Sequence, residues 1–139
     1  MNVAGYSTTP LAKKLGIRAG DQALFVNFPT HYIQLFEVFP EIHQVEQHVA
    51  SPGTLDFIHL FCTTQSDFEK RSLTLKPLLK PSGMMWVSWP KKSSSIKSDL
   101  NRDLIRDFLL ANGLVDVKVC AVDADWSGLK FVYRLKDRS

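Results

Sequence analysis

The amino-acid sequence predicts an α/β fold, with a mostly parallel sheet of about six strands between helices and an antiparallel hairpin at its end. Short apolar runs typical of strands alternate with helix-like segments along the 139 residues. The last two strand-like runs are separated only by residues 124–128, which is short enough for a hairpin. The length and a hydrophobic content of 45% suit one compact domain over residues 1–139.

The N-terminal segment 7–16 predicts a short helix. Thr9 can cap its first turn, Pro10 suits the first helical position, and Gly16 can end it. The three residues before Thr9, Tyr6–Thr8, could instead fold over the sheet as a clasp. A role in capping the helix is the simpler interpretation.

An apolar run over residues 21–28 predicts the first strand. Residues 31–39 follow between Pro29 and Pro40, and they predict a helix that the second proline ends. Four large side chains would share one face of this helix: Tyr32, Ile33, Phe36 and Phe39.

The segments 42–49 and 55–62 both predict strands, on either side of a turn at residues 51–54. A parallel crossover normally needs about a dozen residues or more. The short connection leaves two arrangements open: an extended loop that crosses the sheet, or a different pairing of these two strands. We expect a shortened fold in which one strand–helix unit is missing.

The next helix is predicted over residues 66–79 by a capping box of Ser66 and Glu69. Two helix-terminating residues follow it, Pro81 and Gly83.

The C-terminal half repeats the alternation, with a strand over 84–89, an amphipathic helix within 99–113, and a hairpin of strands 115–123 and 129–135. The helix carries one apolar row and then a terminating glycine: Leu100, Leu104, Phe108 and Ala111, followed by Gly113.

The composition excludes several classes of protein. The net charge of +3 comes from dispersed basic residues, which argues against a nucleic-acid partner. No apolar run approaches the roughly 20 residues that span a bilayer, and the first ten residues do not resemble a signal peptide. Cys62 and Cys120 lie in apolar runs, as expected for reduced, buried cysteines of a cytoplasmic protein.

Three stretches resemble a family of small bacterial proteins of unknown function: AGYSTTPLAKKLGI at 4–17, WVSWPKK at 86–92, and GLVDVKVCAVDADWSGLKFVYR at 113–134. The resemblance implies a bacterial, cytoplasmic protein. It also implies a Rossmann-like three-layer sandwich, in the form of a shortened class I methyltransferase-like fold. It implies no catalytic residue.

The sequence departs from methyltransferases after the first strand, where those enzymes have a glycine-rich turn that lets the backbone approach S-adenosylmethionine. No glycine occurs from Leu24 to Phe39, and Phe28 and Pro29 stand at the turn. This argues against S-adenosylmethionine in the usual pose. A phosphate-binding P-loop is excluded as well, because no GK[ST] motif occurs.

In open α/β sheets, ligands bind beyond the carboxyl ends of the strands. Lysines, hydroxyls, aromatic rings and helix-start amides at these ends could hold a phosphate or a carboxylate. The sequence places nine candidate ligand-binding residues there: Asn27, Thr30, Thr63, Thr64, Trp89, Lys91, Lys92, Asp123 and Trp126.

A simpler interpretation competes with this site. Trp86 and Trp89 can simply cap the core, and Lys91 and Lys92 can be solvated or paired with Asp123 and Asp125.

Other chemistries have weaker support. The four histidines, at 31, 43, 48 and 59, show no metal-ligand spacing, and no Cys-x-x-Cys motif occurs, so we expect no metal. Ser88 lacks the GxSxG context of a hydrolase nucleophile. Cysteine nucleophiles are disfavoured, since apolar surroundings raise the pKa of a thiol.

The sequence therefore predicts a non-catalytic or cryptic domain that binds a small anionic ligand. A divergent S-adenosylmethionine-dependent transferase is the first alternative. A protein-interaction or homodimerisation module is the second, because 11% of the residues are aromatic and an edge strand is expected.

Overall fold

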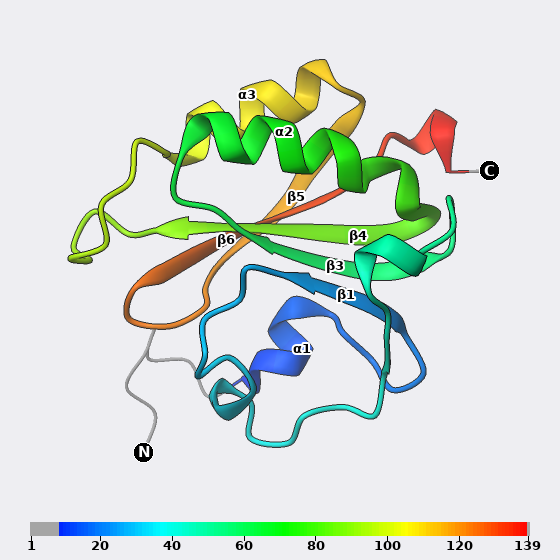
Figure 1. Ribbon diagram of the computed structural model, residues 1–139, viewed down its shortest axis with the longest axis horizontal. Coiled ribbons are helices and arrows are strands. Elements are labelled where there is room, and N and C mark those ends of the chain that lie inside the picture. Colours follow the sequence, from blue (N-terminus) through cyan, green and yellow to red (C-terminus); the bar gives the residue numbers. More distant parts are fainter. Residues whose placement is uncertain (1–8, 139) are drawn as a thin grey trace.

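The computed structural model describes residues 9–138 and confirms the α/β prediction (Figure 1). Six strands form one sheet in the order β2-β1-β3-β4-β6-β5. Strands β1 to β4 pair in parallel, and β6 runs antiparallel to both β4 and β5. The strands are β1 (Gln22–Val26), β2 (His43–Gln44), β3 (Leu55–Phe61), β4 (Leu79–Pro90), β5 (Leu114–Ala121) and β6 (Trp126–Tyr133).

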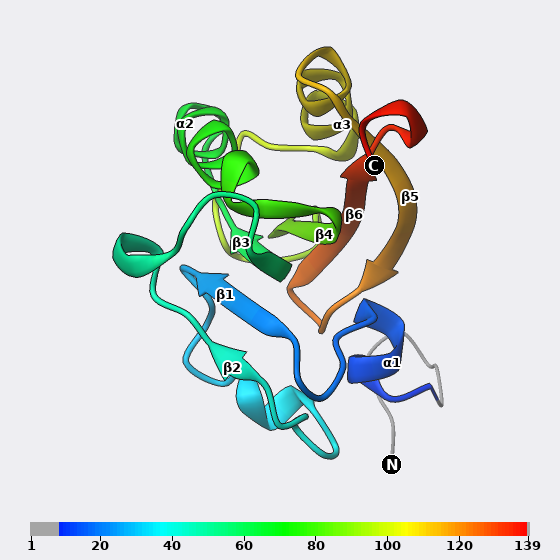
Figure 2. The ribbon, with the colours of Figure 1, turned by 90° about the vertical axis from the view of Figure 1, so that its right-hand side faces the viewer.

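Helices cover both faces of the sheet, as Figures 1 and 2 show. On one face lie α2 (Gln65–Leu75) and α3 (Arg102–Ala111). The other face is covered by α1 (Leu11–Leu15) and the irregular segment 27–39. Within residues 9–138, no helix has both the length and the apolar character needed to cross a bilayer.

The sequence left open how the strands on either side of residues 51–54 pair, and in the structure both pair with β1. Strands β2 and β3 lie on either side of β1 and run parallel to it, so they do not pair with each other. The chain between them holds a short 3₁₀ helix, Gln47–Val49, in place of the second half of the predicted strand 42–49.

The prediction of a helix over residues 31–39 is wrong. Only a 3₁₀ turn forms, Ile33–Leu35, and Ile33 is 48% exposed although it was expected in the core. Pro29 and Pro40 leave few residues for a helix between them. Tyr32, which contacts five aromatic rings, holds the segment against the sheet instead.

The observed cap and end of α2 differ from those predicted from the sequence. Thr64, not Ser66, caps α2, because its Oγ1 accepts from the amide of Asp67 at 3.2 Å. Pro81 and Gly83 lie inside β4 rather than at a helix end. A Cβ at Gly83 would stand 2.7 Å from the carbonyl oxygen of Leu55, so only glycine fits there.

The apolar face of α3 is rotated from the predicted row. Ile105 and Leu109 are fully buried, whereas Ala111 is exposed. The predicted terminator is confirmed, since Gly113 has a φ of +94°. In α1, Gly16 has the left-handed φ of +80° expected at a helix end, but Pro10 is the N-cap residue rather than the first helical residue. Tyr6–Thr8 lie outside the described residues.

Candidate functional site: a lysine-lined groove at the end of β4

The predicted site residues do gather at the carboxyl edge of the sheet. They follow β1 (Asn27, Thr30), β3 (Thr63, Thr64) and β4 (Lys91, Lys92). The turn between β5 and β6 reaches the same edge, because Pro90 pairs with Trp126. The structure nevertheless gives these residues different roles.

The two threonines after β3 serve the local backbone. Thr64 caps α2 with its hydroxyl, and the carbonyl of Thr63 accepts from the amide of Asp99 at 3.3 Å. The amide of Gln65, at the start of α2, donates to Asp99 Oδ1 at 2.7 Å. These bonds tie the loop before α3 to the end of β3, so Thr63 and Thr64 organise the edge of the sheet.

The two tryptophans are core residues on opposite faces. Trp89 is 8% exposed and packs in the apolar layer under α2 and α3. Trp126 is equally buried on the other face, with its ring 5.1 Å from that of Phe61. The core interpretation therefore holds for Trp89, and for Trp86, which is fully buried. Trp126, predicted as a ligand contact, is a core residue as well, and Trp89 also borders a surface groove.

Asp123 is a structural carboxylate rather than an exposed ligand contact. It is 6% exposed, and its Oδ1 accepts from the amides of Asp125 and Trp126, both at 2.8 Å. Its Oδ2 lies 2.8 Å from His31 Nε2. This pair joins the segment after β1 to the turn between β5 and β6.

Lys91 and Lys92 line a groove of about 580 Å³ between the end of β4 and the start of α3. Trp89 and Pro90 form its apolar part, and Arg102 adds a third cation; its other lining residues are Leu100, Asn101, Asp103, Leu104, Asp107 and Ser127. The two lysines also line an adjoining cavity of about 380 Å³. Within residues 9–138, neither lysine forms an ion pair, so of the two simpler alternatives the pairing with Asp123 and Asp125 does not occur. The other alternative, solvated lysines, agrees with the half-buried Lys91 and the exposed Lys92.

The backbone around this groove is well anchored. The amide of Lys91 donates to the carbonyl of Asp125 at 2.8 Å, and Ser94 Oγ donates to Asp125 Oδ1 at the same distance. The loop after β4 is therefore fixed to the turn between β5 and β6, while the lysine ammonium groups remain available.

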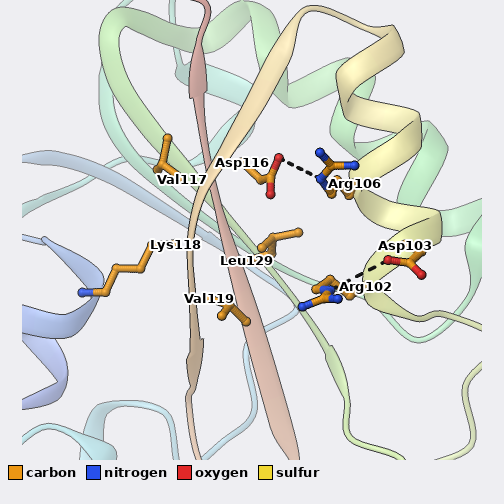
Figure 3. A pocket seen from close by; sticks show the side chains of 8 residues that line it. All are labelled: Arg102, Asp103, Arg106, Asp116, Val117, Lys118, Val119 and Leu129. Atoms are coloured by element: carbon orange, nitrogen blue, oxygen red, sulfur yellow. Dashed lines mark hydrogen bonds and ion pairs between the residues drawn. The ribbon is translucent and has the colours of Figure 1, made fainter.

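A second groove shows the contrasting case (Figure 3). It holds about 470 Å³ between α3 and the edge strand β5. Both of its arginines are paired, since Arg106 Nε lies 3.1 Å from Asp116 Oδ1, and Arg102 lies 3.8 Å from Asp103. Lys118, which also lines it, donates to the carbonyl oxygen of Lys14. An anion would have to compete with these carboxylates for the arginines, which makes this groove the weaker candidate.

A buried polar chain was missed by the sequence analysis. Tyr32 Oη lies 2.8 Å from His59 Nδ1, and His59 Nε2 lies 2.8 Å from Ser88 Oγ. His59 is completely buried, and desolvation lowers its pKa to about 3. Burial, and secondarily the charge of Cys120, raises the pKa of Tyr32. All three groups are therefore neutral near pH 7.

The Tyr32–His59–Ser88 chain is structural rather than catalytic. Ser88 and His59 are 0% exposed, so no substrate reaches the hydroxyl. A polar residue in the middle of each of two apolar runs, His59 in 55–62 and Ser88 in 84–89, was the only sequence signal for this contact. Residues 9–138 contain no cluster of histidine, cysteine or carboxylate side chains that could hold a metal ion.

Neither cysteine is an activated nucleophile. Burial raises the pKa of Cys62 to about 12, with a further contribution from Asp67. Burial also raises the pKa of Cys120, and three nearby lysines oppose this rise only in part. Both thiols are free.

Comparisons with solved structures identify the fold. A SAM-dependent methyltransferase from Aquifex aeolicus superposes with a TM-score of 0.61 at 13% identity, over 87% of this chain and 86% of that one. The magnesium protoporphyrin IX methyltransferase of Synechocystis, with bound SAH, gives a TM-score of 0.57 at 8% identity, over 88% and 78%. The sheet is thus that of the class I methyltransferases, in a small form.

The same fold also carries other chemistry. The [4+2]-cyclase SpnF superposes with a TM-score of 0.55 at 10% identity, over 88% of this chain and 79% of that one. No protein-family model matches the sequence, and no curated protein sequence matches it either. At these identities the likeness establishes the fold and leaves the function to the site itself.

Proposed function

We propose that this protein is a non-catalytic or cryptic binding domain for a small anionic ligand, which it holds in the groove formed by Lys91 and Lys92. The observation that carries the proposal is the unpaired state of these two cations within the described chain. Carboxylates and phosphates form strong charge-assisted hydrogen bonds with such ammonium groups. The location, beyond the carboxyl end of a parallel strand, is where open α/β sheets bind ligands.

The groove offers complementary contacts for such a ligand. Trp89 and Pro90 give an apolar wall, and Arg102 stands at the first turn of α3. Asp103 and Asp107 lie on the α3 side of the groove, so a ligand with a polar, neutral portion there and an anionic portion near the lysines fits best. A small phosphorylated or carboxylated metabolite has this character.

The turn after β1 supports the proposal that S-adenosylmethionine does not bind in the usual pose. Asn27 takes the left-handed φ of +58° that glycine would normally supply, and Phe28 and Pro29 follow with bulky side chains. Tyr32 then fills the space against β3, where it contacts His59 and Phe61. We therefore propose that the protein does not use this cofactor.

A divergent S-adenosylmethionine-dependent transferase is the second candidate, and the fold of the solved methyltransferases favours it. In that case the cofactor would have to bind beside Phe28 rather than along a glycine turn. A bacterial, cytoplasmic origin and membership of the small-protein family also remain proposals, supported by the three sequence stretches described above.

A thermal-shift screen of the purified protein tests the proposal. The panel contains S-adenosylmethionine, S-adenosylhomocysteine, adenine and nicotinamide nucleotides, and common phosphates and carboxylates. A ligand at 100 times its Kd should stabilise the fold by about 2.7 kcal/mol, or several degrees in Tm. We expect a shift with an anion and none with S-adenosylmethionine.

The decisive variant is the double substitution Lys91→Ala with Lys92→Ala. It should abolish the shift caused by the panel anion without lowering the Tm of the free protein. Lys13→Ala with Lys70→Ala is the matched control, because both lysines are exposed and neither lines the groove. A shift with S-adenosylmethionine would contradict the first proposal and favour the second candidate. No shift across the panel would contradict both and favour the interaction module.

A further inference from the structure

Two lysines face each other directly on the α1 side of the sheet. Lys118 of β5 and Lys130 of β6 are register partners in the antiparallel pair. Like charges directly opposite one another destabilise a sheet. No ion pair within residues 9–138 relieves either lysine.

The end of α1 lies over this pair. Lys118 Nζ donates to the carbonyl oxygen of Lys14 at 2.9 Å, and Figure 3 shows its side chain pointing toward α1, away from Asp116 and Arg106. A Cβ placed on Gly16 would stand 3.6 Å from Lys130 Nζ. Both ammonium groups therefore lie beside the last turn of α1.

The ammonium groups of Lys118 and Lys130 differ in their hydrogen-bond acceptors. A helix-end carbonyl explains Lys118 as a structural cap. Lys130 has no hydrogen-bond acceptor among the described residues, and it is partly buried. Burial, and then the charge of Lys118, lowers the pKa of Lys130. The fold thus keeps a partly desolvated cation next to another cation.

A third cation belongs to the same neighbourhood. Lys14, Lys118 and Lys91 all act electrostatically on the thiol of Cys120, which lies two residues beyond Lys118 in β5. Lys91 reaches it from the end of β4, across the hairpin. Positive charge is therefore concentrated around Cys120, although the whole chain carries only +3, and Lys118 is the cation that acts on Lys130.

We propose that Lys14, Lys118 and Lys130 form a second anion site, which binds a multivalent oxyanion such as a phosphate or pyrophosphate group beside the end of α1. A dianion or trianion offsets the repulsion between Lys118 and Lys130, and a monovalent anion does so only in part. The site lies beside the end of α1, and the groove of Lys91 and Lys92 lies between the end of β4 and the start of α3. Substitution of Lys130 tests the first and substitution of Lys92 tests the second.

Isothermal titration of pyrophosphate into the full-length protein, at low ionic strength, tests this site. Lys130→Gln removes a partly buried cation that has no hydrogen-bond acceptor among the described residues, and it should weaken binding by about ten- to a hundredfold, as expected for a lost charge-assisted hydrogen bond. Lys130→Arg keeps the charge and should bind within a few-fold of the wild type. Lys13→Gln is the matched control, because it removes an exposed charge from the same helix and should have almost no effect.

The stability of the free variant separates a binding role from a structural one. Lys130→Gln removes a repulsive contact, so its Tm without ligand should equal or exceed that of the wild type. Lys118→Gln is a second binding-deficient variant, and it should also lose affinity. Lys92→Ala should leave pyrophosphate affinity unchanged at this site.

Three results would overturn the proposal. One is the absence of pyrophosphate binding by the wild type at millimolar concentration. The second is an equal loss of affinity in Lys13→Gln and Lys130→Gln, which would indicate only diffuse charge. The third is a lower Tm for free Lys130→Gln, which would show that Lys130 stabilises the fold.

Discussion

The two faces of the sheet are covered by core layers of different side chains. Under α2 and α3 the layer is mainly aliphatic, with Leu, Ile, Val and Met side chains from the strands meeting Ile105 and Leu109. Under α1 and the segment 27–39 it is mainly aromatic, with Phe25, Tyr32 and Trp86 among its members. Only the aromatic face contains the buried Tyr32–His59–Ser88 chain.

The two faces also differ in the interactions that hold their covering segments, which are α2 and α3 on one face and α1 with residues 27–39 on the other. Two regular helices bury an apolar stripe on the first face, and burial of apolar area is the main force that positions them. Polar contacts at their ends and exposed sides, such as Arg106 with Asp116, add to it. On the second face the cover is short or irregular, and specific hydrogen bonds position it. Trp86 Nε1 donates to the carbonyl of Leu15 at 2.7 Å, and His31 pairs with Asp123. We therefore expect the first face to respond to lost volume and the second to lost polar partners.

The largest expected effect is a pH dependence that belongs to the second face. The folded pKa of His59 is about 3, below its ordinary value of 6.5, because its burial disfavours the charged form. The unfolded chain then binds more protons below pH 6.5, so stability falls as the pH falls toward 3. The slope should approach about 1.4 kcal/mol per pH unit.

Urea unfolding at several pH values between 6.5 and 4.5 measures this slope above the range where most carboxylates titrate. His59→Gln is the control, because glutamine does not titrate in this range. Equal slopes in the wild type and His59→Gln would contradict the assignment.

The next effect belongs to the first face. Leu109→Ala leaves a cavity between α3 and the sheet and should lower the free energy of unfolding by about 2–5 kcal/mol. Leu109→Met keeps most of the volume and should cost less than about 1.5 kcal/mol. Chemical denaturation of the two variants gives the difference. A cost for Leu109→Met as large as that for Leu109→Ala would show that volume is not what holds α3 in place.

A smaller effect probes the polar chain. Tyr32→Phe keeps the ring contacts but leaves His59 Nδ1 without its partner, which should cost about 1–3 kcal/mol. Tyr133→Phe is the matched control, since its hydroxyl donates to the carbonyl of Lys76 in a half-buried position and should cost about 1 kcal/mol or less. Denaturant midpoints compare them. Equal costs would mean that the buried chain contributes no more than an ordinary surface bond.

The same contrast explains which elements the sequence could predict. Helix α3 follows an apolar period that is visible along the chain, and α2 follows local capping residues. Their predictions failed in the cap and the end of α2, and in the rotation of α3. The irregular segment 27–39 has aromatic residues in helical spacing. Its conformation depends on contacts with His59 and Asp123, which are distant in sequence. No local pattern encodes such contacts.

The candidate site divides in a similar way. The placement of Lys91 and Lys92 at the carboxyl edge followed from the order of strands alone. The roles of Thr64, Asp123 and Trp126 as a cap, a turn carboxylate and a core ring depend on side-chain geometry, and the sequence could not separate them from ligand contacts. The facing pair Lys118 and Lys130 required the strand register, including the shift between Asp116 and Lys118.

The most direct test of the central claim is a map of amide chemical shifts in the ¹⁵N-labelled protein. It would be titrated separately with the panel anion that raises Tm most and with S-adenosylmethionine. We predict that the anion shifts the amides of Trp89, Lys91, Lys92 and residues 101–104, and that S-adenosylmethionine leaves the amides of Asn27, Phe28, Thr30 and residues 62–65 unchanged. Saturable shifts at residues 27–30 with S-adenosylmethionine, and none around Lys91 with the anion, would contradict the account and place the ligand at the end of β1.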